Sequence, residues 1–291
     1  MKKREEIKKT YTSRQIFIKK FMKNKLAVAG VIVIIIFVVS SVFAQVFATF
    51  DPNATDLLKI RSAPDKVHIL GTDDLGRDIF SRLLYGGRIS IAVGVASMML
   101  QIVIGVTVGV VAGYFGGIVD KIIMRIVDII MCFPFFVIAI ALAAVIGGSI
   151  TNLVLIIGML MWPVITRIVR GEVLVTKQNE YILAARALGF NTFEIIVHHI
   201  LPNIISAILV SSTLCIAQGI LMEATLSFLG LGVNPPTPSW GNMLVAAQNM
   251  SVLSHKWWMW IPAGMSVVLI VLSVNFVGDG LRDALDVGTS A

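Results

Sequence analysis

The chain has 291 residues, of which 57% are hydrophobic and only 14% are charged, and its mean hydropathy is +0.88. Soluble domains carry roughly 25% charged residues, so this composition excludes an ordinary soluble protein and predicts an all-α polytopic protein of the cell membrane, with the lipid bilayer as its solvent. The net charge of +7 gathers in residues 1–25, which hold ten Lys or Arg and two Glu. This charge could indicate a nucleic-acid partner, but in front of an apolar run it is better interpreted as a topology signal, so we expect no nucleic acid.

The uncharged runs predict six transmembrane helices. Residues 26–48 are long enough to cross a hydrocarbon core of roughly 30 Å. Their end loosely resembles a signal-peptidase site, but the apolar region of a signal peptide has only about 7–15 residues, so we expect an uncleaved first helix. The other five spans are expected near 89–119, 124–146, 151–169, 204–230 and 257–278.

Six spans place both ends of the chain on one side, and the positive-inside rule makes that side the cytoplasm. In this N-in/C-in arrangement most Lys and Arg residues lie inside. The predicted organisation is a basic cytoplasmic segment 1–25, a first transmembrane helix 26–48, an extracytoplasmic loop 49–88, a five-helix core 89–280 with a cytoplasmic loop at about 170–203, and a cytoplasmic tail 281–291.

The cytoplasmic loop contains the polar stretch 180-EYILAARALGFNTFEIIVHHILPN-203. Its first part has helix-forming residues, and Gly189 is suited to end that helix in a left-handed conformation. Asn191 can cap a second helix, with Glu194 completing a capping box. Pro202 lacks an N–H and should stop or bend this helix. Connections usually have only about 4–6 residues, so a loop with its own helices indicates a docking element.

This stretch resembles the "EAA" loop, the cytoplasmic segment of permease subunits in binding-protein-dependent ABC importers. The matching residues are Ala184, Ala185, Gly189, Leu201 and Pro202. Where the family usually has a glutamate this chain has Leu183, and the nearest acidic residue is Glu180, close to the same helical face. The resemblance implies that these residues contact an ATPase, through shape and apolar contact or through Glu180.

Three further stretches resemble the second permease subunit of dipeptide, oligopeptide and nickel importers: 70-LGTDDLGRDIFSRLLYGGRIS-90, 226-LSFLGLGVNPPTPSWGNML-244 and 278-GDGLRDALD-286. The resemblance implies a type I importer permease fold and transport of peptides or, alternatively, of nickel or a metallophore. It also implies four partners: a homologous second permease, two cytoplasmic ATPases that bind ATP and Mg²⁺, and an extracytoplasmic solute-binding protein.

The sequence contains no phosphate-binding G-x-x-x-x-G-K-[ST] motif. It also has no recognisable catalytic motif, and the spacing of its two cysteines fits neither a disulfide framework nor a metal site. We therefore expect a transport subunit that is not an enzyme and that binds no cofactor or metal of its own.

Ionisable groups inside a membrane are candidates for function. Glu223 lies in the fifth predicted span, where it could line the translocation path or hydrogen-bond to a neighbouring helix. Asp128 follows Arg125 by three residues, a spacing that favours a local ion pair.

Two patterns favour structural roles. Asp73, Asp74 and Asp78 lack the spacing of a calcium loop, so we expect them to cap backbone groups and to help dock the delivery protein. Glycines recur every four residues from Gly105 to Gly113, a stripe typical of closely packed membrane helices.

Overall fold

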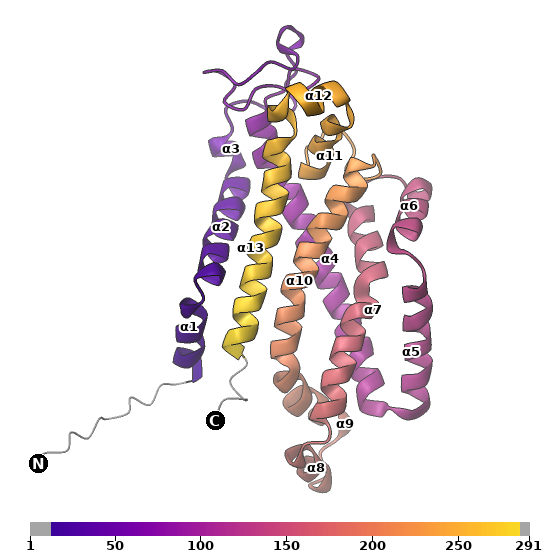
Figure 1. Ribbon diagram of the computed structural model, residues 1–291. Helices are drawn as coiled ribbons and strands as arrows, with labels where there is room; N and C mark the ends of the chain where they lie inside the picture. Colours follow the sequence, from indigo (N-terminus) through magenta and orange to yellow (C-terminus); the bar gives the residue numbers. More distant parts are fainter. Residues whose placement is uncertain (1–12, 286–291) are drawn as a thin grey trace, which may run out of the picture.

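The computed structural model describes residues 13–285, and within this range the chain is almost entirely helical, with one isolated bridge between Thr72 and Asp78. The long helices stand side by side in an elongated bundle (Figure 1). The outer parts of the predicted terminal segments 1–25 and 281–291 lie outside the described residues.

The first predicted span is confirmed in position, as two helices in succession. A short helix α1, Ser13–Lys23, precedes α2, Lys25–Val42, and α3, Ala44–Phe47, follows directly. Asn24 separates α1 from α2, and its side-chain oxygen accepts a hydrogen bond from the Ala27 N–H at 3.2 Å. This N-cap lets the basic helix α1 meet the apolar helix α2 without a longer connection.

The second long helix begins earlier than the sequence predicts. The loop was expected over 49–88, but α4 spans Ile79–Phe115. The last ten residues of the expected loop therefore belong to the helix. Asp78 caps this helix, because its carboxylate accepts the Ser81 N–H at 2.8 Å. Because the first turns of α4 contain polar residues, hydropathy alone does not predict that the helix begins there. The outer loop that remains contains one short helix, η1, Leu57–Lys59.

The predicted span 124–146 is wrong as a single helix. The segment forms α5, Gly117–Cys132, and α6, Phe135–Ile146, which are bent by 80° relative to each other. Pro134 explains the break, because proline drives the preceding residue out of the α-helical region. Phe133 accordingly has extended backbone angles, with φ −88° and ψ 135°.

The ion pair expected within this segment is also wrong. Asp128 of α5 pairs with Arg167 of the neighbouring helix α7 at 2.5 Å rather than with Arg125 on its own helix. A second pair, Arg170 with Asp120 at 2.5 Å, joins the same two helices. Because α5 and α7 lie against each other, their charges meet across the contact.

The remaining three spans are confirmed, and each helix is longer than predicted. The helices in order are α7 Ile150–Thr176, α8 Glu180–Ala187, α9 Thr192–Glu194, η2 Ile195–Ile200, α10 Leu201–Phe228, α11 Trp240–Leu244, η3 Val245–Gln248, α12 Met250–His255, η4 Trp257–Met259 and α13 Ile261–Leu285. The predicted spans overlap α7, α10 and α13, but residues 229–230 and 257–260 lie outside these helices. The connection expected over about 170–203 is shorter as a non-spanning segment, because α7 continues to Thr176, and α13 continues past residue 280 to Leu285.

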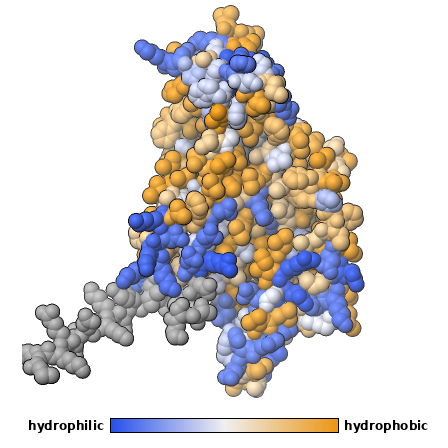
Figure 2. All heavy atoms as spheres, viewed as in Figure 1, coloured by the Kyte–Doolittle hydropathy of each residue, from blue (hydrophilic) through white to orange (hydrophobic). Residues whose placement is uncertain are grey.

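Five helices in the described range are long and apolar enough to cross a membrane, or six spans if the bent pair of α5 and α6 forms one. The free ends of α1 and α13 lie at the same end of the bundle as α8, whereas α11 and α12 lie at the opposite end (Figure 1). The face drawn in Figure 2 is mostly hydrophobic over its middle, with hydrophilic side chains gathered at the upper end and over the lower part. This distribution is what a bilayer imposes on a protein surface.

The glycine stripe of α4 packs against α7, as predicted. A Cβ atom added to Gly109 would lie 2.9 Å from the Thr166 carbonyl oxygen, and one added to Gly105 would lie 2.6 Å from the Cβ atom of Ile165. Both distances are shorter than ordinary van der Waals contact, so only glycine lets the two helices approach this closely. The α4–α7 pair is the central contact of the bundle.

Candidate functional site

The segment between α7 and α10 forms a compact insert that begins at Lys177 and includes α8, α9 and η2. Helix α8 ends as predicted, because Gly189 adopts a left-handed φ of 86°. The Phe190 N–H donates to the Ala185 carbonyl at 3.2 Å and the Gly189 N–H to the Arg186 carbonyl at 3.0 Å. This pair of hydrogen bonds is the Schellman arrangement that closes helices at glycine.

The second helix of the insert begins at the predicted capping box. The side chain of Asn191 accepts the Glu194 N–H at 2.9 Å, and the Glu194 carboxylate accepts the Asn191 N–H at 2.9 Å. These two bonds satisfy donors that an uncapped helix start would leave without partners. They also fix the turn between α8 and α9.

Of the prediction that Pro202 stops or bends this helix, the stop is wrong. Residues 192–228 form one continuous helix, in which η2 is a stretch of π-helix. The Leu201 N–H donates to the Ile196 carbonyl, five residues earlier, instead of the usual four. This wider turn lies directly before Pro202, which has no N–H to donate, so the helix passes the proline without breaking.

Four apolar side chains anchor the insert to the bundle. Ile182 and Ala185 of α8 are buried, as are Ile195 and Ile200 of η2, and they pack in one cluster with Val173 of α7. Burying apolar side chains of this size stabilises the contact by about 1.5–3 kcal/mol for each large residue. The insert is therefore a packed part of the molecule and moves with α7 and α10.

Two polar contacts join the same insert to the end of α4. The Lys177 ammonium donates to the Gly113 carbonyl at 2.7 Å, which satisfies one of the carbonyls that α4 leaves unpaired at its end. The Arg186 guanidinium lies over the ring of Tyr114, 5.1 Å from its centroid. Movement of α8 is consequently transmitted to α4 as well as to α7.

The exposed surface of the insert includes four large apolar side chains among polar ones. Leu188 is 77% exposed and Phe193 is 73% exposed, and Leu183 and Phe190 are also exposed. Large exposed apolar side chains that cluster outside the lipid band mark contact sites for other proteins. We define these four residues as the insert patch, and it lies at the tip of the bundle that carries α8 (Figure 1).

The predicted coupling residues divide into three groups. Glu180, Leu183, Ala184, Gly189 and Pro202 are exposed, Leu201 is partly buried, and Ala185 is buried. The prediction placed Ala185 in the contact with an ATPase, but its side chain faces the core of this chain and positions α8 from within. Leu188 and Phe193 were missed, although two large apolar residues beside Gly189 and Asn191 were a signal available in the sequence.

Glu223 is fully buried near the opposite end of α10. Its carboxylate accepts hydrogen bonds from the hydroxyls of Ser90 at 2.7 Å and Ser227 at 2.8 Å. Ser90 belongs to α4 and also accepts the Trp240 N–H of α11 at 3.1 Å. Of the two interpretations of Glu223, the neighbouring-helix bond is confirmed. No part of the side chain is exposed in this conformation, and its role in the translocation path stays a prediction.

Asp73 and Asp78 have the capping roles that the sequence predicts, whereas Asp74 forms an ion pair in place of a cap. Asp73 accepts the Leu75 N–H at 2.9 Å and the Arg77 N–H at 3.0 Å, and Asp74 pairs with Arg61. Asp78 adds to its helix cap a 3.0 Å contact with the His68 ring. The expected docking of a delivery protein on this loop stays a prediction.

Two family models match the sequence. Residues 105–290 match the model described as binding-protein-dependent transport system inner membrane component, and residues 12–64 match the N-terminal TM domain of oligopeptide transport permease C.

Similar proteins of known name cover most of the chain. It is 41% identical over 268 residues to the oligopeptide transport system permease protein OppC of Bacillus subtilis, covering 92% of this chain and 87% of the relative. The dipeptide transport system permease protein DppC of Alkalihalophilus pseudofirmus is also 41% identical over 268 residues, 92% of this chain and 88% of the relative. The glutathione transport system permease protein GsiD of Pectobacterium atrosepticum is 40% identical over 271 residues, 93% of this chain and 89% of the relative.

Proposed function

The chain belongs to the binding-protein-dependent transport system inner membrane components, and we propose that it is one of two homologous permease subunits of an ATP-driven importer of short peptides. The observation that carries this proposal is the similarity of about 40% over more than nine-tenths of the chain to permeases named for oligopeptides, dipeptides and glutathione. These three relatives favour peptides over the alternative of nickel or a metallophore.

We further propose that the insert docks on one of two cytoplasmic ATPases. The insert patch is apolar, exposed and carried by elements that are anchored to three long helices. Leu183 replaces the usual glutamate, so the contact depends on apolar burial. ATP and Mg²⁺ act on the ATPases, and closure of the ATPase pair moves the insert as a rigid body.

The proposed topology places α8 and both chain ends in the cytoplasm and the loop 49–78 outside the cytoplasmic membrane. The basic residues of α1 and the positive-inside rule support this orientation. The outside loop is then where a solute-binding protein delivers the peptide.

Co-expression and reconstitution test the proposal. The chain should co-purify with a second permease and two ATPases, and proteoliposomes containing these subunits and the solute-binding protein should take up radiolabelled tri-alanine only when ATP is supplied on the ATPase side. Uptake of tri-alanine by liposomes that contain this chain alone would refute it. Uptake of Ni²⁺ but not of peptide by the whole complex would favour the nickel alternative.

A further inference from the structure

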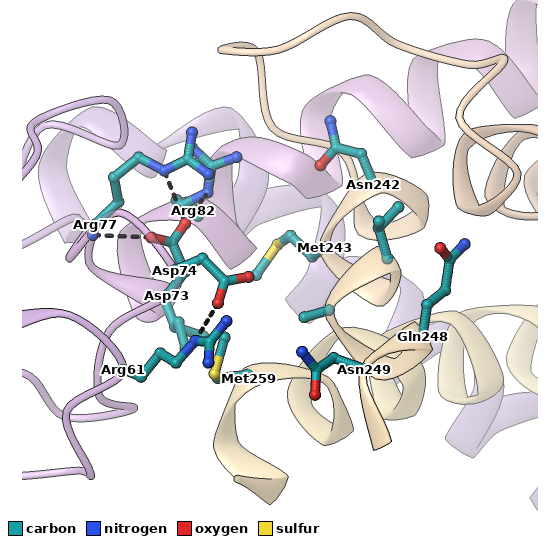
Figure 3. A pocket seen from close by; sticks show the side chains of 13 residues that line it. Arg61, Asp73, Asp74, Arg77, Arg82, Asn242, Met243, Gln248, Asn249 and Met259 are labelled. Atoms are coloured by element: carbon teal, nitrogen blue, oxygen red, sulfur yellow. Dashed lines mark hydrogen bonds and ion pairs between the residues drawn. The ribbon is translucent and has the colours of Figure 1, made fainter. Parts of the chain in front are cut away.

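A cavity of about 500 Å³ opens at the end of the bundle opposite the insert. One wall is formed by the loop that precedes α4 and by the first turn of α4, and it carries three arginines and two aspartates: Arg61, Asp73, Asp74, Arg77 and Arg82. The facing wall comes from α11, η3 and Asn249, and the methionines Met243 and Met259 lie between the two walls (Figure 3). The volume is within the range of roughly 300–1,000 Å³ found for small-molecule sites.

The charged wall has an excess of positive charge. Arg77 and Arg82 share the carboxylate of Asp73, at 2.7 Å and 3.5 Å from its Oδ2 atom, whereas Asp74 pairs with Arg61. The side chain of Arg82 is only 5% exposed and that of Arg77 only 15%. Two nearly buried guanidinium groups therefore have one carboxylate between them, and a second anion is needed for balance.

Arg77 and Arg82 also have N–H groups without a hydrogen-bond acceptor among the described residues. Arg77 uses its Nε atom for Asp73, and Arg82 uses one terminal nitrogen for the Pro52 carbonyl at 2.9 Å. Within residues 13–285, neither terminal nitrogen of Arg77 and only one of the two on Arg82 has an acceptor. Parallel N–H groups of a guanidinium match the two oxygens of a carboxylate.

The facing wall offers one amide group that points towards the gap between the walls, that of Asn249 (Figure 3). Gln248 points away from the arginines and donates through Nε2 to the Phe228 carbonyl at 2.6 Å. The side-chain oxygen of Asn249 accepts the Ser251 N–H at 3.0 Å, and its Nδ2 group has no partner elsewhere in the described part of the chain. Such an N–H group can donate to the carbonyl of a peptide group.

We propose that this cavity binds the C-terminal end of a short peptide, with the terminal carboxylate against Arg77 and Arg82 and the last peptide carbonyl against the Asn249 amide. This inference rests on the proposed function as a peptide importer. It adds a ligand site in this subunit, on the outer side, that selects peptides by their free carboxylate before translocation.

The same arginines could instead receive an acidic side chain of the docking protein. The cavity favours the peptide, because a protein side chain would neutralise the guanidinium groups but would leave the Asn249 amide N–H group of the opposite wall unused. The mixed lining, with methionine between ionic and amide walls, fits a small molecule that has an apolar side chain, a peptide group and a terminal charge.

Equilibrium binding to the complete membrane complex, in nanodiscs and without the solute-binding protein, tests the inference. The probes are tri-alanine and tri-alanine amide, which differ only in the terminal charge. We expect the free acid to bind at least about tenfold more tightly than the amide, because hydrogen bonds to charged groups are worth that much or more. Arg77→Gln should weaken binding of the acid about tenfold to a hundredfold and leave binding of the amide unchanged.

Three further variants control for misfolding and for general charge effects. Asn249→Asp places a negative charge on the facing wall while it keeps the oxygen that accepts the Ser251 N–H, and it should also weaken binding of the acid, without removing any arginine. Arg77→Lys keeps the charge and should restore part of the preference. Lys66→Gln removes one positive charge from an exposed position of the same loop outside the cavity, and it should bind both probes like the wild type.

Uptake of tri-alanine by the complete wild-type system distinguishes a failure of the cavity proposal from a failure of the proposed function. If uptake is normal but the wild-type complex binds acid and amide equally, or does not bind the acid, the cavity proposal is overturned and the proposed function stands. If no peptide is taken up, the proposed function itself fails. If Arg77→Gln weakens the affinity for the solute-binding protein and leaves the preference for the acid intact, the cavity is a protein-docking site and the proposal is wrong.

Discussion

A single carboxylate, that of Glu223, connects three elements near the outer end of the bundle. The carboxylate receives hydroxyl groups from α4 and from its own helix, and Ser90 extends the network to the backbone of α11. Buried polar groups are tolerated when they are hydrogen-bonded in this way. The residue therefore stabilises the outer end, although its position in an apolar helix suggests a role in transport.

Substitution of Glu223 separates these roles. Glu223→Ala should destabilise the complex by about 2–4 kcal/mol, because two buried hydroxyls lose their acceptor and a cavity is left. Glu223→Gln keeps an acceptor oxygen in the same place and should cost about 1 kcal/mol. Thermal unfolding of the purified complex measures both effects. Normal stability combined with altered peptide selectivity in the glutamine variant would indicate that the side chain lines the path after all.

Among the helices, the contact between α4 and α7 depends on the absence of side chains. Gly109→Val would place methyl groups against the Thr166 carbonyl and Val169, where even a Cβ atom lies 2.9 Å from both. Overpacking of this kind costs about 1–3 kcal/mol, so the thermal unfolding temperature of the complex should fall.

Gly171→Ala is the matched control for this helix pair. Gly171 lies in α7, and an added Cβ atom would meet nothing within 4 Å among the described residues. Because alanine is a better helix former by about 1 kcal/mol, this variant should be neutral or slightly more stable. Equal loss of stability in both variants would show that close packing is not the reason for the stripe.

The insert patch provides a prediction about coupling. Leu188→Asp and Phe193→Asp should leave the complex folded, because both side chains are exposed. They should also abolish the stimulation of ATP hydrolysis by peptide-loaded solute-binding protein, because an apolar contact cannot accommodate an unpaired charge.

Leu58→Asp is the control for the insert patch, since Leu58 is 96% exposed in the outer loop. It introduces the same charge and should couple normally. Undiminished ATPase stimulation and uptake in both insert variants would show that the insert patch is not part of the docking surface.

Local signals in the sequence predicted the ends of elements well where a single residue decides them. Gly189 and Asn191 act within one turn of backbone, so the turn between α8 and α9 was predictable, and so was the stripe from Gly105 to Gly113. The break at Pro134 was not predicted, because residues 129–166 are all uncharged and the mean hydropathy of such a run changes little with one proline. The early start of α4 was missed for the opposite reason, since its first turns are polar.

Contacts between elements were less predictable. The pairing of Asp128 with Arg167 depends on which helices are neighbours, and only the three-dimensional arrangement supplies that information. Burial of Ala185 and Glu223 likewise depends on what packs against α8 and α10. The family resemblance identified the insert but not which of its side chains face outwards.

At the scale of the whole molecule, the proposed orientation can be tested by labelling. In a background with Cys132→Ser and Cys215→Ser, Leu188→Cys and Leu58→Cys introduce single thiols at opposite ends of the bundle. A membrane-impermeant maleimide added to intact cells or spheroplasts should modify position 58 only, and inside-out vesicles should show the reverse. Labelling of position 188 from the outside would show that the topology is the reverse of the proposed one.

The continuous helix of residues 192–228 also has a mechanical consequence. At 1.5 Å per residue, its 37 residues measure roughly 55 Å from end to end. One end carries Phe193 of the insert patch, and the other reaches the Glu223 network beneath α11. A rod of this length acts as a lever, since a tilt of about 5° at one end displaces the other by roughly 5 Å. The π-helical stretch lies near the end of the rod that carries the insert. In the proposed topology this end is cytoplasmic, so a small stroke of the proposed ATPases would become a larger displacement at the opposite end of the rod.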